Sequence, residues 1–145
     1  ASAMDVLQPL LTKEGVEPIG KVILGTVKGD VHTIGKSLVG MMLRGAGFDV
    51  DDLGVDVTPG QFVAAARAGA DVIGISSLLT TTMVSMRAVV QALEEAGLRD
   101  RVKVMVGGAP VTTEYANAIG ADGFSDNAGG AVTLARRLTA MARPS

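Results

Sequence analysis

The sequence has no cysteine and only one histidine, His32, among its 145 residues. Without cysteine the chain has no disulfide, no thiolate metal site and no cysteine nucleophile, which fits a reducing cytoplasm. A single histidine cannot hold a zinc ion without further ligands. Cysteine chemistry and histidine-rich metal sites are therefore excluded.

Strong charge bias and long apolar segments are also lacking. The chain carries 13 basic and 15 acidic residues, and the lysines and arginines are scattered rather than gathered in a stripe. This distribution lacks the electrostatic footprint of a nucleic-acid-binding protein. No apolar run approaches the roughly 18 residues of a membrane span, and the N-terminus has no signal-peptide pattern. We expect a soluble, cytoplasmic protein with neither a nucleic-acid nor a membrane partner.

Glycine and aliphatic residues are abundant instead. Aromatic residues make up only 3% of the sequence, whereas glycine occurs 19 times, often close to expected turns. This composition suits tight strand-to-helix loops over an aliphatic core. With 48% hydrophobic residues, a chain of this length can form one domain with one sizeable core.

Short apolar runs rich in β-branched residues predict strands at 21–26, 48–50 with Leu53, 71–75 and 102–106, and a weaker fifth strand at 122–124. Segments with apolar residues at helical spacing lie between these runs. Such an alternation predicts an α/β fold, an open five-stranded parallel sheet with helices on both faces.

Two of the expected helices are marked by apolar residues that should pack against the sheet. These residues are Ile34, Leu38, Met41 and Met42 in the first helix, and Met83, Met86, Val90 and Leu93 in the second. A third helix is expected to begin with Thr58 as N-cap and Pro59 at the first helical position. Asp126 is expected to cap the last helix. Residues 3–12 do not fit the scheme, and are either a lid over the sheet edge or the end of a helical domain.

Ligands of open parallel sheets bind at the carboxyl ends of the strands. This rule selects the loops at 27–35, 76–82, 107–110 and 124–128, all rich in Gly, Ser, Thr or Asp. The only histidine lies in the first of them. We therefore expect the functional site at this edge of the sheet.

The end of the first loop, Gly35-Lys36-Ser37, is the end of a phosphate-binding loop motif, G-x-x-x-x-G-K-[ST]. The spacing does not fit the rest of that motif, because Asp30 stands where the first glycine is required. A carboxylate there would repel the phosphates that the backbone must bind. The sequence thus argues against a nucleotide hydrolase.

Asp30 and His32 form a more informative pair. A carboxylate two residues before an imidazole can accept the proton of one ring nitrogen and leave the other nitrogen free for a metal. One histidine suffices only where the metal brings most of its own coordination, as cobalt does in a corrin or iron in a haem. The alternative is an ordinary surface histidine in a loop.

Three motifs in the expected order resemble those of cobalamin-binding domains, which have a flavodoxin-like or Rossmann-like fold. Asp30-x-His32-x-x-Gly35 resembles the D-x-H-x-x-G signature, Ser76-Ser77-Leu78 the S-x-L motif, and Gly107-Gly108 the glycine pair. The resemblance covers about residues 17–142. It implies a base-off cobalamin or related corrinoid, in which His32 replaces the dimethylbenzimidazole base as the axial ligand of cobalt.

The resemblance also implies roles for other residues. His32, Asp30 and Thr82 would form a relay beneath cobalt, and the alternative for Thr80 to Thr82 is an ordinary helix N-terminus. Glycines at 35, 107 and 108 would give the nucleotide tail room, Ser76 and Thr80 would donate hydrogen bonds to it, and Leu78 and Met83 would offer apolar contact. The expected cofactor-binding residues are Gly29, Asp30, Val31, His32, Thr33, Ile34, Gly35, Ser76, Leu78, Thr80, Thr82, Met83, Gly107, Gly108, Ala109, Phe124, Ser125, Asp126 and Ala128.

Within this family, the segments 54–57, 74–83 and 106–111 are most similar to the small corrinoid proteins of methyltransferase systems, and the domain is also similar to the cobalamin domain of methionine synthase. Such proteins carry a methyl group on cobalt from methanol, methylamines or aryl methyl ethers to an acceptor methyltransferase. The resemblance implies a carrier that is not catalytic alone. Its partners would be a donor-side and an acceptor-side methyltransferase, with a reductive activase as a possible third.

In those proteins a helical cap precedes the cobalamin-binding domain. The resemblance therefore identifies residues 1–16 as a remnant of that cap with its linker, and residues 17–145 as the cobalamin-binding domain. Two other functions remain open at this point. One is the small cobalamin-binding subunit of an adenosylcobalamin mutase, and the other is a corrinoid-dependent sensor or regulator.

Overall fold

The computed structural model describes residues 18–142 except 31 and 33. The expectations for residues 1–16, Val31 and Thr33 lie outside the described part of the chain. The strands are β1 (Lys21–Thr26), β2 (Asp49–Asp52), β3 (Val72–Ser76), β4 (Lys103–Gly107) and β5 (Gly123–Phe124). The helices are α2 (Ile34–Gly45), α3 (Pro59–Arg67), the 3-10 turn η1 (Thr80–Thr82), α4 (Val84–Glu95), α5 (Thr113–Ile119) and α6 (Ala128–Ala142).

All five strands are parallel and are ordered β2-β1-β3-β4-β5, which confirms the predicted open sheet. β1 coincides with its predicted range, and the other strands lie within two residues of theirs. The strand order places β1 beside β3, although β2 lies between them in sequence. The connections that leave β1 and β3 therefore diverge in opposite directions along the sheet.

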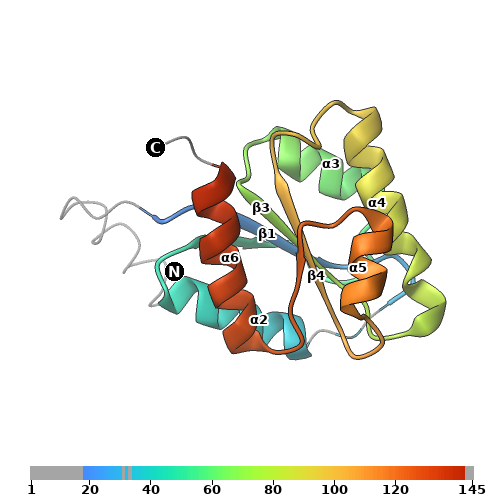
Figure 1. Ribbon diagram of the computed structural model, residues 1–145, viewed down its shortest axis with the longest axis horizontal. Coiled ribbons are helices and arrows are strands. Elements are labelled where there is room, and N and C mark those ends of the chain that lie inside the picture. Colours follow the sequence, from blue (N-terminus) through green and yellow to red (C-terminus); the bar gives the residue numbers. More distant parts are fainter. Residues whose placement is uncertain (1–17, 31, 33, 143–145) are drawn as a thin grey trace.

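Helices cover both faces of the sheet: α2 and α6 lie on one face, and α3, α4 and α5 lie on the other (Figure 1). Each face has its own buried apolar cluster, because successive side chains of a strand point to opposite faces. Ile23 and Ile73 pack with Phe62 of α3 on one side. Val22 and Val72 belong to the α2/α6 cluster on the other.

The predicted packing face of α2 is wrong. Its four apolar markers are largely exposed: Ile34 is 86%, Leu38 49%, Met41 67% and Met42 40% accessible. The face toward the sheet holds Lys36, Gly40 and Leu43 instead. Gly40 brings the helix close to β1, since a Cβ there would lie 3.3 Å from Leu24. Lys36 is buried because its ammonium group pairs with Asp52 at the end of β2.

Helix starts were predicted with mixed success. Thr58 caps α3 with a complete capping box, in which Gln61 donates its backbone N–H to the Thr58 side chain, and Pro59 opens the helix as expected. The predicted cap of α6 is wrong by one residue. The N–H of Gly130 donates to the side chain of Asn127 over 2.6 Å, so Asn127 rather than Asp126 satisfies the first turn.

Candidate functional site

The site forms at the carboxyl ends of β1 and β3, where the two connections separate. The loop after β1 leads to α2 on one face, whereas the loop after β3 leads through η1 to α4 on the other face. Such a divergence opens a crevice at the edge of a parallel sheet, and it is the usual binding position in this architecture. Asp30 and His32 come from the first loop, and residues 77–82 from the second.

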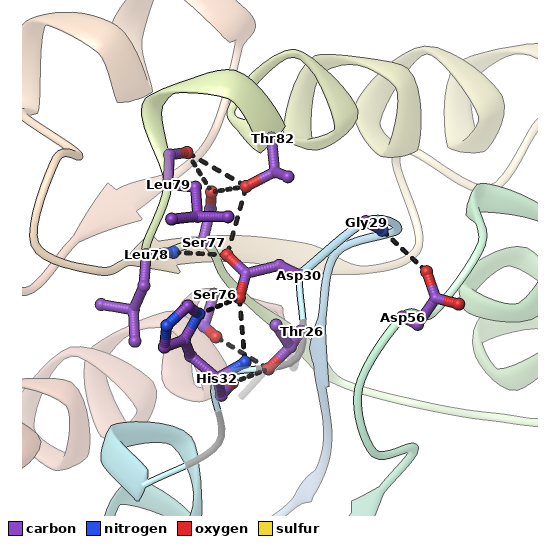
Figure 2. Close-up of polar contacts among 10 residues, drawn as sticks. All are labelled: Thr26, Gly29, Asp30, His32, Asp56, Ser76, Ser77, Leu78, Leu79 and Thr82. Atoms are coloured by element: carbon purple, nitrogen blue, oxygen red, sulfur yellow. Dashed lines mark hydrogen bonds and ion pairs between the residues drawn. The ribbon is translucent and has the colours of Figure 1, made fainter.

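Asp30 is the centre of the hydrogen-bond network in this crevice and is fully buried (Figure 2). Oδ1 accepts the backbone N–H of His32 over 2.9 Å and lies 2.8 Å from His32 Nδ1. Oδ2 accepts the backbone N–H of Leu78 over 2.7 Å and the hydroxyl of Thr82 over 3.1 Å. A carboxylate offers about four acceptor positions, so all of them are filled.

These donors keep Asp30 ionised. Burial alone raises the pKa of the carboxyl, but hydrogen bonds from the backbone N–H groups of His32 and Leu78, and from the side chains of His32 and Thr82, outweigh it and lower the pKa to about 2. Hydrogen bonds to the charged form of an acid act in this direction. At neutral pH the network therefore holds a fixed negative charge beside the imidazole.

His32 is held by its backbone and by one ring nitrogen. Thr26 donates its hydroxyl to the His32 carbonyl over 3.0 Å, while the His32 N–H donates to Asp30. Because Asp30 is ionised and can only accept, Nδ1 donates its proton to Oδ1, and in the neutral form of the imidazole the lone pair is then on Nε2. The side chain is 50% exposed, so this lone pair is available to a ligand that enters from outside. Metal-binding histidines commonly make such a hydrogen bond to a carboxylate through the ring nitrogen that does not bind the metal.

Two buried hydroxyl groups continue the network on the other side of Asp30. Thr82, 8% exposed, lies in η1, and its Oγ1 is 2.8 Å from the Oγ of the fully buried Ser77. Ser77 was not among the predicted site residues, whereas its neighbour Ser76 was. Ser76 points to the opposite face of the sheet and lies 3.1 Å from the Thr26 hydroxyl. The alternation of side chains along a strand was the signal that could have separated the two serines.

A cavity of about 450 Å³ opens beside His32, on the face of the sheet that α2 and α6 cover. Its volume lies within the range of small-molecule sites. Ten predicted residues line it: His32, Gly35, Ser76, Leu78, Gly107, Gly108, Ala109, Ser125, Asp126 and Ala128. The cavity thus joins residues from the loops after β1, β3, β4 and β5.

Other predicted residues lie outside the cavity lining. Asp30 contacts His32 on the side away from the cavity, and Thr82 contacts Asp30 in turn. Gly29 forms a turn in which its N–H donates to Asp56. Met83 and Phe124 pack against the apolar cluster of α3, α4 and α5, on the far face of the sheet. Ile34 and Thr80 also lie outside the lining.

The floor and walls of the cavity were missed by sequence reasoning. They comprise Leu24, Lys36, Leu38, Val39, Gly74, Ile75, Met105, Val106, Asn127 and Ala131. Most belong to strands or helices, whereas the strand-end rule selects residues of loops. Gly74, in the middle of β3, was a usable signal because strand glycines often mark a close approach. A Cβ at this residue would lie 2.6 Å from Leu24 and 3.1 Å from Met105.

The three glycines expected to give a cofactor tail room differ in what surrounds them. A Cβ at Gly35 would meet nothing within 4 Å. A Cβ at Gly107 would lie 3.0 Å from the Ser125 carbonyl oxygen, and one at Gly108 only 1.8 Å from the Ser77 carbonyl oxygen. Gly108 also has a φ of +127°. The glycine at 108 is therefore required by the approach of the protein's own backbone.

Within the described part of the chain, no group of three or more His, Asp or Glu side chains could hold a metal ion. His32 could thus ligate only a metal that brings its remaining ligands with it. None of the helices in residues 18–142 is both long and apolar enough to cross a membrane.

Comparison with known proteins identifies the family. Residues 20–134 match the family model described as the B12 binding domain. A corrinoid protein of Desulfitobacterium hafniense (strain Y51) is 47% identical over 137 residues, which are 92% of this chain and 63% of that protein. Dimethylamine corrinoid protein 3 of Methanosarcina mazei is 52% identical over 123 residues, which are 84% of this chain and 74% of that protein.

Solved structures agree with the sequence comparison. The monomethylamine corrinoid protein of Methanosarcina barkeri has a TM-score of 0.79 and 41% identity, over 94% of this chain and 65% of that one. The methanol:cobalamin methyltransferase complex of the same species contains a chain with a TM-score of 0.80 and 26% identity, over 94% of this chain and 63% of that one. This chain therefore spans about two thirds of the length of these relatives. The motifs, the sheet and the matched residues together show that the chain belongs to the B12 binding domain family.

Proposed function

We propose that this domain holds a corrinoid with His32 as the axial ligand of cobalt and serves as a methyl carrier between two methyltransferases. The observation that carries the proposal is the His32–Asp30–Thr82 network at the mouth of the cavity. Asp30 lies 2.8 Å from His32 Nδ1 and 3.1 Å from Thr82 Oγ1. The carboxylate orients the imidazole so that Nε2 faces away from it.

The residues present fit a corrinoid in two respects. The half-exposed imidazole supplies one ligand, and cobalt in a corrin ring needs only one from the protein. The cavity of about 450 Å³ beside it is lined mainly by aliphatic and glycine residues, which suits the long, narrow nucleotide tail of a base-off corrinoid. Ser76, at the carboxyl end of β3, is the predicted hydrogen-bond donor that also lines this space.

Each residue of the network would have a separate task. When bound, the cofactor supplies cobalt as the atom to which the methyl group is attached. His32 would ligate the metal, and Asp30 would fix the tautomer and orientation of the ring. Thr82 would donate its hydroxyl proton to Asp30 and so limit the negative charge that reaches the imidazole.

The relatives' names support the methyl-carrier function. They include dimethylamine and monomethylamine corrinoid proteins and a methanol:cobalamin methyltransferase complex. We infer that this chain likewise works with a donor-side and an acceptor-side methyltransferase. A reductive activase is a further candidate partner, which these names do not mention.

A binding experiment tests the ligand assignment. The protein is mixed with hydroxocobalamin, desalted, and its visible spectrum recorded for the wild type and for His32→Ala, with Arg136→Ala as a control on the exposed side of α6. We expect cofactor retention in the wild type and in the control, and a changed spectrum or lost cofactor in His32→Ala. No retention by the wild type, or an unchanged spectrum in His32→Ala, would reject the assignment.

A second set of ligands separates carriers from light sensors. The protein is loaded with methylcobalamin or adenosylcobalamin, kept dark or illuminated, and its oligomeric state is measured. The carrier function predicts no light-driven change in assembly. A change of oligomeric state on photolysis, without methyl transfer to a methyltransferase, would support a sensor instead.

A further inference from the structure

Two buried hydroxyl groups and one backbone carbonyl lie on the far side of Asp30 from His32, and their hydrogen bonds can be counted. They are the hydroxyl oxygens of Ser77 and Thr82 and the carbonyl oxygen of Leu79 (Figure 2). Each hydroxyl has one proton to donate and two lone pairs to accept with, whereas a carbonyl oxygen only accepts, through two lone pairs. Ser77 is fully buried, and its hydroxyl proton therefore has to find its acceptor within this group.

The Thr82 hydroxyl has two competing acceptors. Its oxygen lies 3.1 Å from Asp30 Oδ2 and 3.0 Å from the Leu79 carbonyl oxygen, but its single proton can serve only one of them well. Asp30 needs this proton to complete its set of four donors. Whether Asp30 receives it depends on how well the Leu79 carbonyl is satisfied by other groups.

Ser77 supplies what the Leu79 carbonyl lacks. That carbonyl accepts the backbone N–H of Thr82 over 3.2 Å, which occupies one lone pair. The Ser77 hydroxyl lies 3.1 Å away and can donate to the second. With both lone pairs filled, the Thr82 proton is left for Asp30, and each of the three donors has an acceptor. The Ser77 proton has a second acceptor in Thr82 Oγ1, 2.8 Å away, and a Thr82 hydroxyl that accepts from Ser77 can still donate to Asp30.

We propose that Ser77 is a positioning residue of the site. By donating to the Leu79 carbonyl, it directs the Thr82 hydroxyl proton to Asp30. The hydrogen bond from His32 Nδ1 to Asp30 Oδ1 is thereby weakened. Only the predicted effect on the redox potential of cobalt rests on the proposed function. The hydrogen-bond count itself concerns atoms of this chain.

The backbone around Ser77 is built to hold it in this orientation. The Ser77 N–H donates to the Gly107 carbonyl over 3.2 Å, and Gly108 approaches the Ser77 carbonyl so closely that no Cβ fits between them. Leu78, next in sequence, donates its N–H to Asp30. The loop after β4 thus holds the loop after β3 in place. The loop after β3 in turn positions the Leu78 N–H that donates to the Asp30 carboxylate.

The direction of the effect follows from charge. A hydroxyl that donates to Oδ2 takes up part of the carboxylate's negative charge, so the bond from His32 Nδ1 to Oδ1 is weaker. Without this donor the carboxylate accepts more strongly from Nδ1, and Nε2 becomes a stronger electron donor to a metal. Thr82→Val should show this effect in full. Ser77→Ala should show a smaller effect of the same sign, because Thr82 is then shared between two acceptors.

The first test uses the corrinoid-free protein, in which His32 is the only histidine and gives a single set of imidazole signals. The ¹⁵N chemical shift of Nδ1 is measured in alkaline buffer through the carbon-bound ring protons. We expect a downfield shift in Thr82→Val, a smaller one in Ser77→Ala, and no further change when Ser77→Ala is added to Thr82→Val. Thr82→Ser, which keeps the hydroxyl, should restore the wild-type shift.

The matched control is Thr139→Val. Thr139 is 3% exposed and its hydroxyl has no hydrogen-bond partner among the described residues, so the change also removes a buried hydroxyl but far from the network. It should leave the Nδ1 shift unchanged. An Nδ1 shift in Ser77→Ala equal to that of the wild type, or one that adds fully to that of Thr82→Val, would overturn the role of Ser77.

The second test loads each variant with hydroxocobalamin and measures the midpoint potential of the Co(II)/Co(I) couple by spectroscopic titration. A stronger imidazole donor favours Co(II), so we expect more negative midpoints in the order wild type, Ser77→Ala, Thr82→Val, with the double variant equal to Thr82→Val. A midpoint in Ser77→Ala that equals the wild-type value or is less negative would contradict the proposal. If the wild type fails to bind the cofactor through His32, the proposed function fails, while the cofactor-free test still decides the role of Ser77.

Discussion

Gly108 and Ser77 approach each other so closely that a Cβ atom at residue 108 would lie 1.8 Å from the Ser77 carbonyl oxygen. This contact joins the glycine pair after β4 to the serine motif after β3. Gly108 also has a φ of +127°, a conformation in which a side chain is strained. The two motifs therefore form one structural unit, which sets the position of the Leu78 N–H against Asp30.

The first prediction concerns Gly108→Ala. The new methyl group has to displace the Ser77 backbone in a strained conformation, and we expect a loss of about 2–4 kcal/mol in the free energy of unfolding. Urea denaturation of the corrinoid-free protein measures it. A variant as stable as the wild type would show that the two loops are not held together by this contact.

Gly35→Ala tests whether the glycine is needed for the stability of the fold or for room that the cofactor tail occupies. Gly35 lies in the first turn of α2, where a Cβ meets nothing within 4 Å, yet it lines the cavity. Alanine is the better helix former, so stability should be unchanged or slightly higher. If the corrinoid tail passes here, hydroxocobalamin retention should fall while the urea midpoint does not. Retention equal to that of the wild type would place the tail elsewhere in the cavity.

Asp30 should make the protein sensitive to acid in a defined range. Its pKa is lowered to about 2 in the folded state from an ordinary value of 3.8, so the carboxylate stabilises the fold fully above pH 3.8. That contribution, about 2 kcal/mol for a shift of this size, is lost as the pH falls from 3.8 toward 2.

Asp30→Asn should remove this pH dependence. At neutral pH the variant should be less stable than the wild type, and the difference should shrink as the pH falls through this range. Urea denaturation of the corrinoid-free protein at a series of pH values measures it, with Asp51→Asn, an exposed residue of β2, as the control. A difference that stays constant with pH would show that Asp30 does not titrate as proposed.

The strands could be predicted from the sequence because their signals are local. A run such as 21–26 is mostly apolar and rich in β-branched residues, and the glycines and Thr58 mark where helices begin and end. The position of the site could also be predicted, because the carboxyl ends of parallel strands meet at one edge. The residues on the floor of the cavity could not, because Leu24, Gly74 and Met105 belong to strands that look like ordinary core.

Errors arose where a residue's partner is far away in sequence. The buried face of α2 could not be predicted from apolar spacing, because Lys36 is buried only through its pairing with Asp52. The role of Ser77 likewise depends on the Leu79 carbonyl and on which face of the sheet each serine occupies. The helix is capped by Asn127 and not by Asp126. Asn and Asp are equally favoured as N-caps, so the sequence alone could not distinguish the two neighbouring positions.

The Lys36–Asp52 pair leads to a prediction about stability. The side chain of Lys36 is 3% exposed and that of Asp52 28% exposed. Asp52→Ala leaves a buried ammonium group without its counter-ion and should cost about 2–3 kcal/mol, somewhat less than for a fully buried pair. The double variant Lys36→Met/Asp52→Ala should recover most of this loss, which urea denaturation can measure. Equal losses in the single and double variants would mean that the charge at Lys36 is not the cause.

The orientation of α2 gives the last prediction. Leu43 is fully buried against the sheet, whereas Met41, two residues earlier, is 67% exposed. Leu43→Ala should therefore cost about 2–4 kcal/mol, as for other buried leucines, and Met41→Ala should change stability by less than about 0.5 kcal/mol. The two variants are matched, because each removes a large apolar side chain from the same helix. The opposite ranking in urea denaturation would mean that α2 packs through the face that its apolar spacing first indicated.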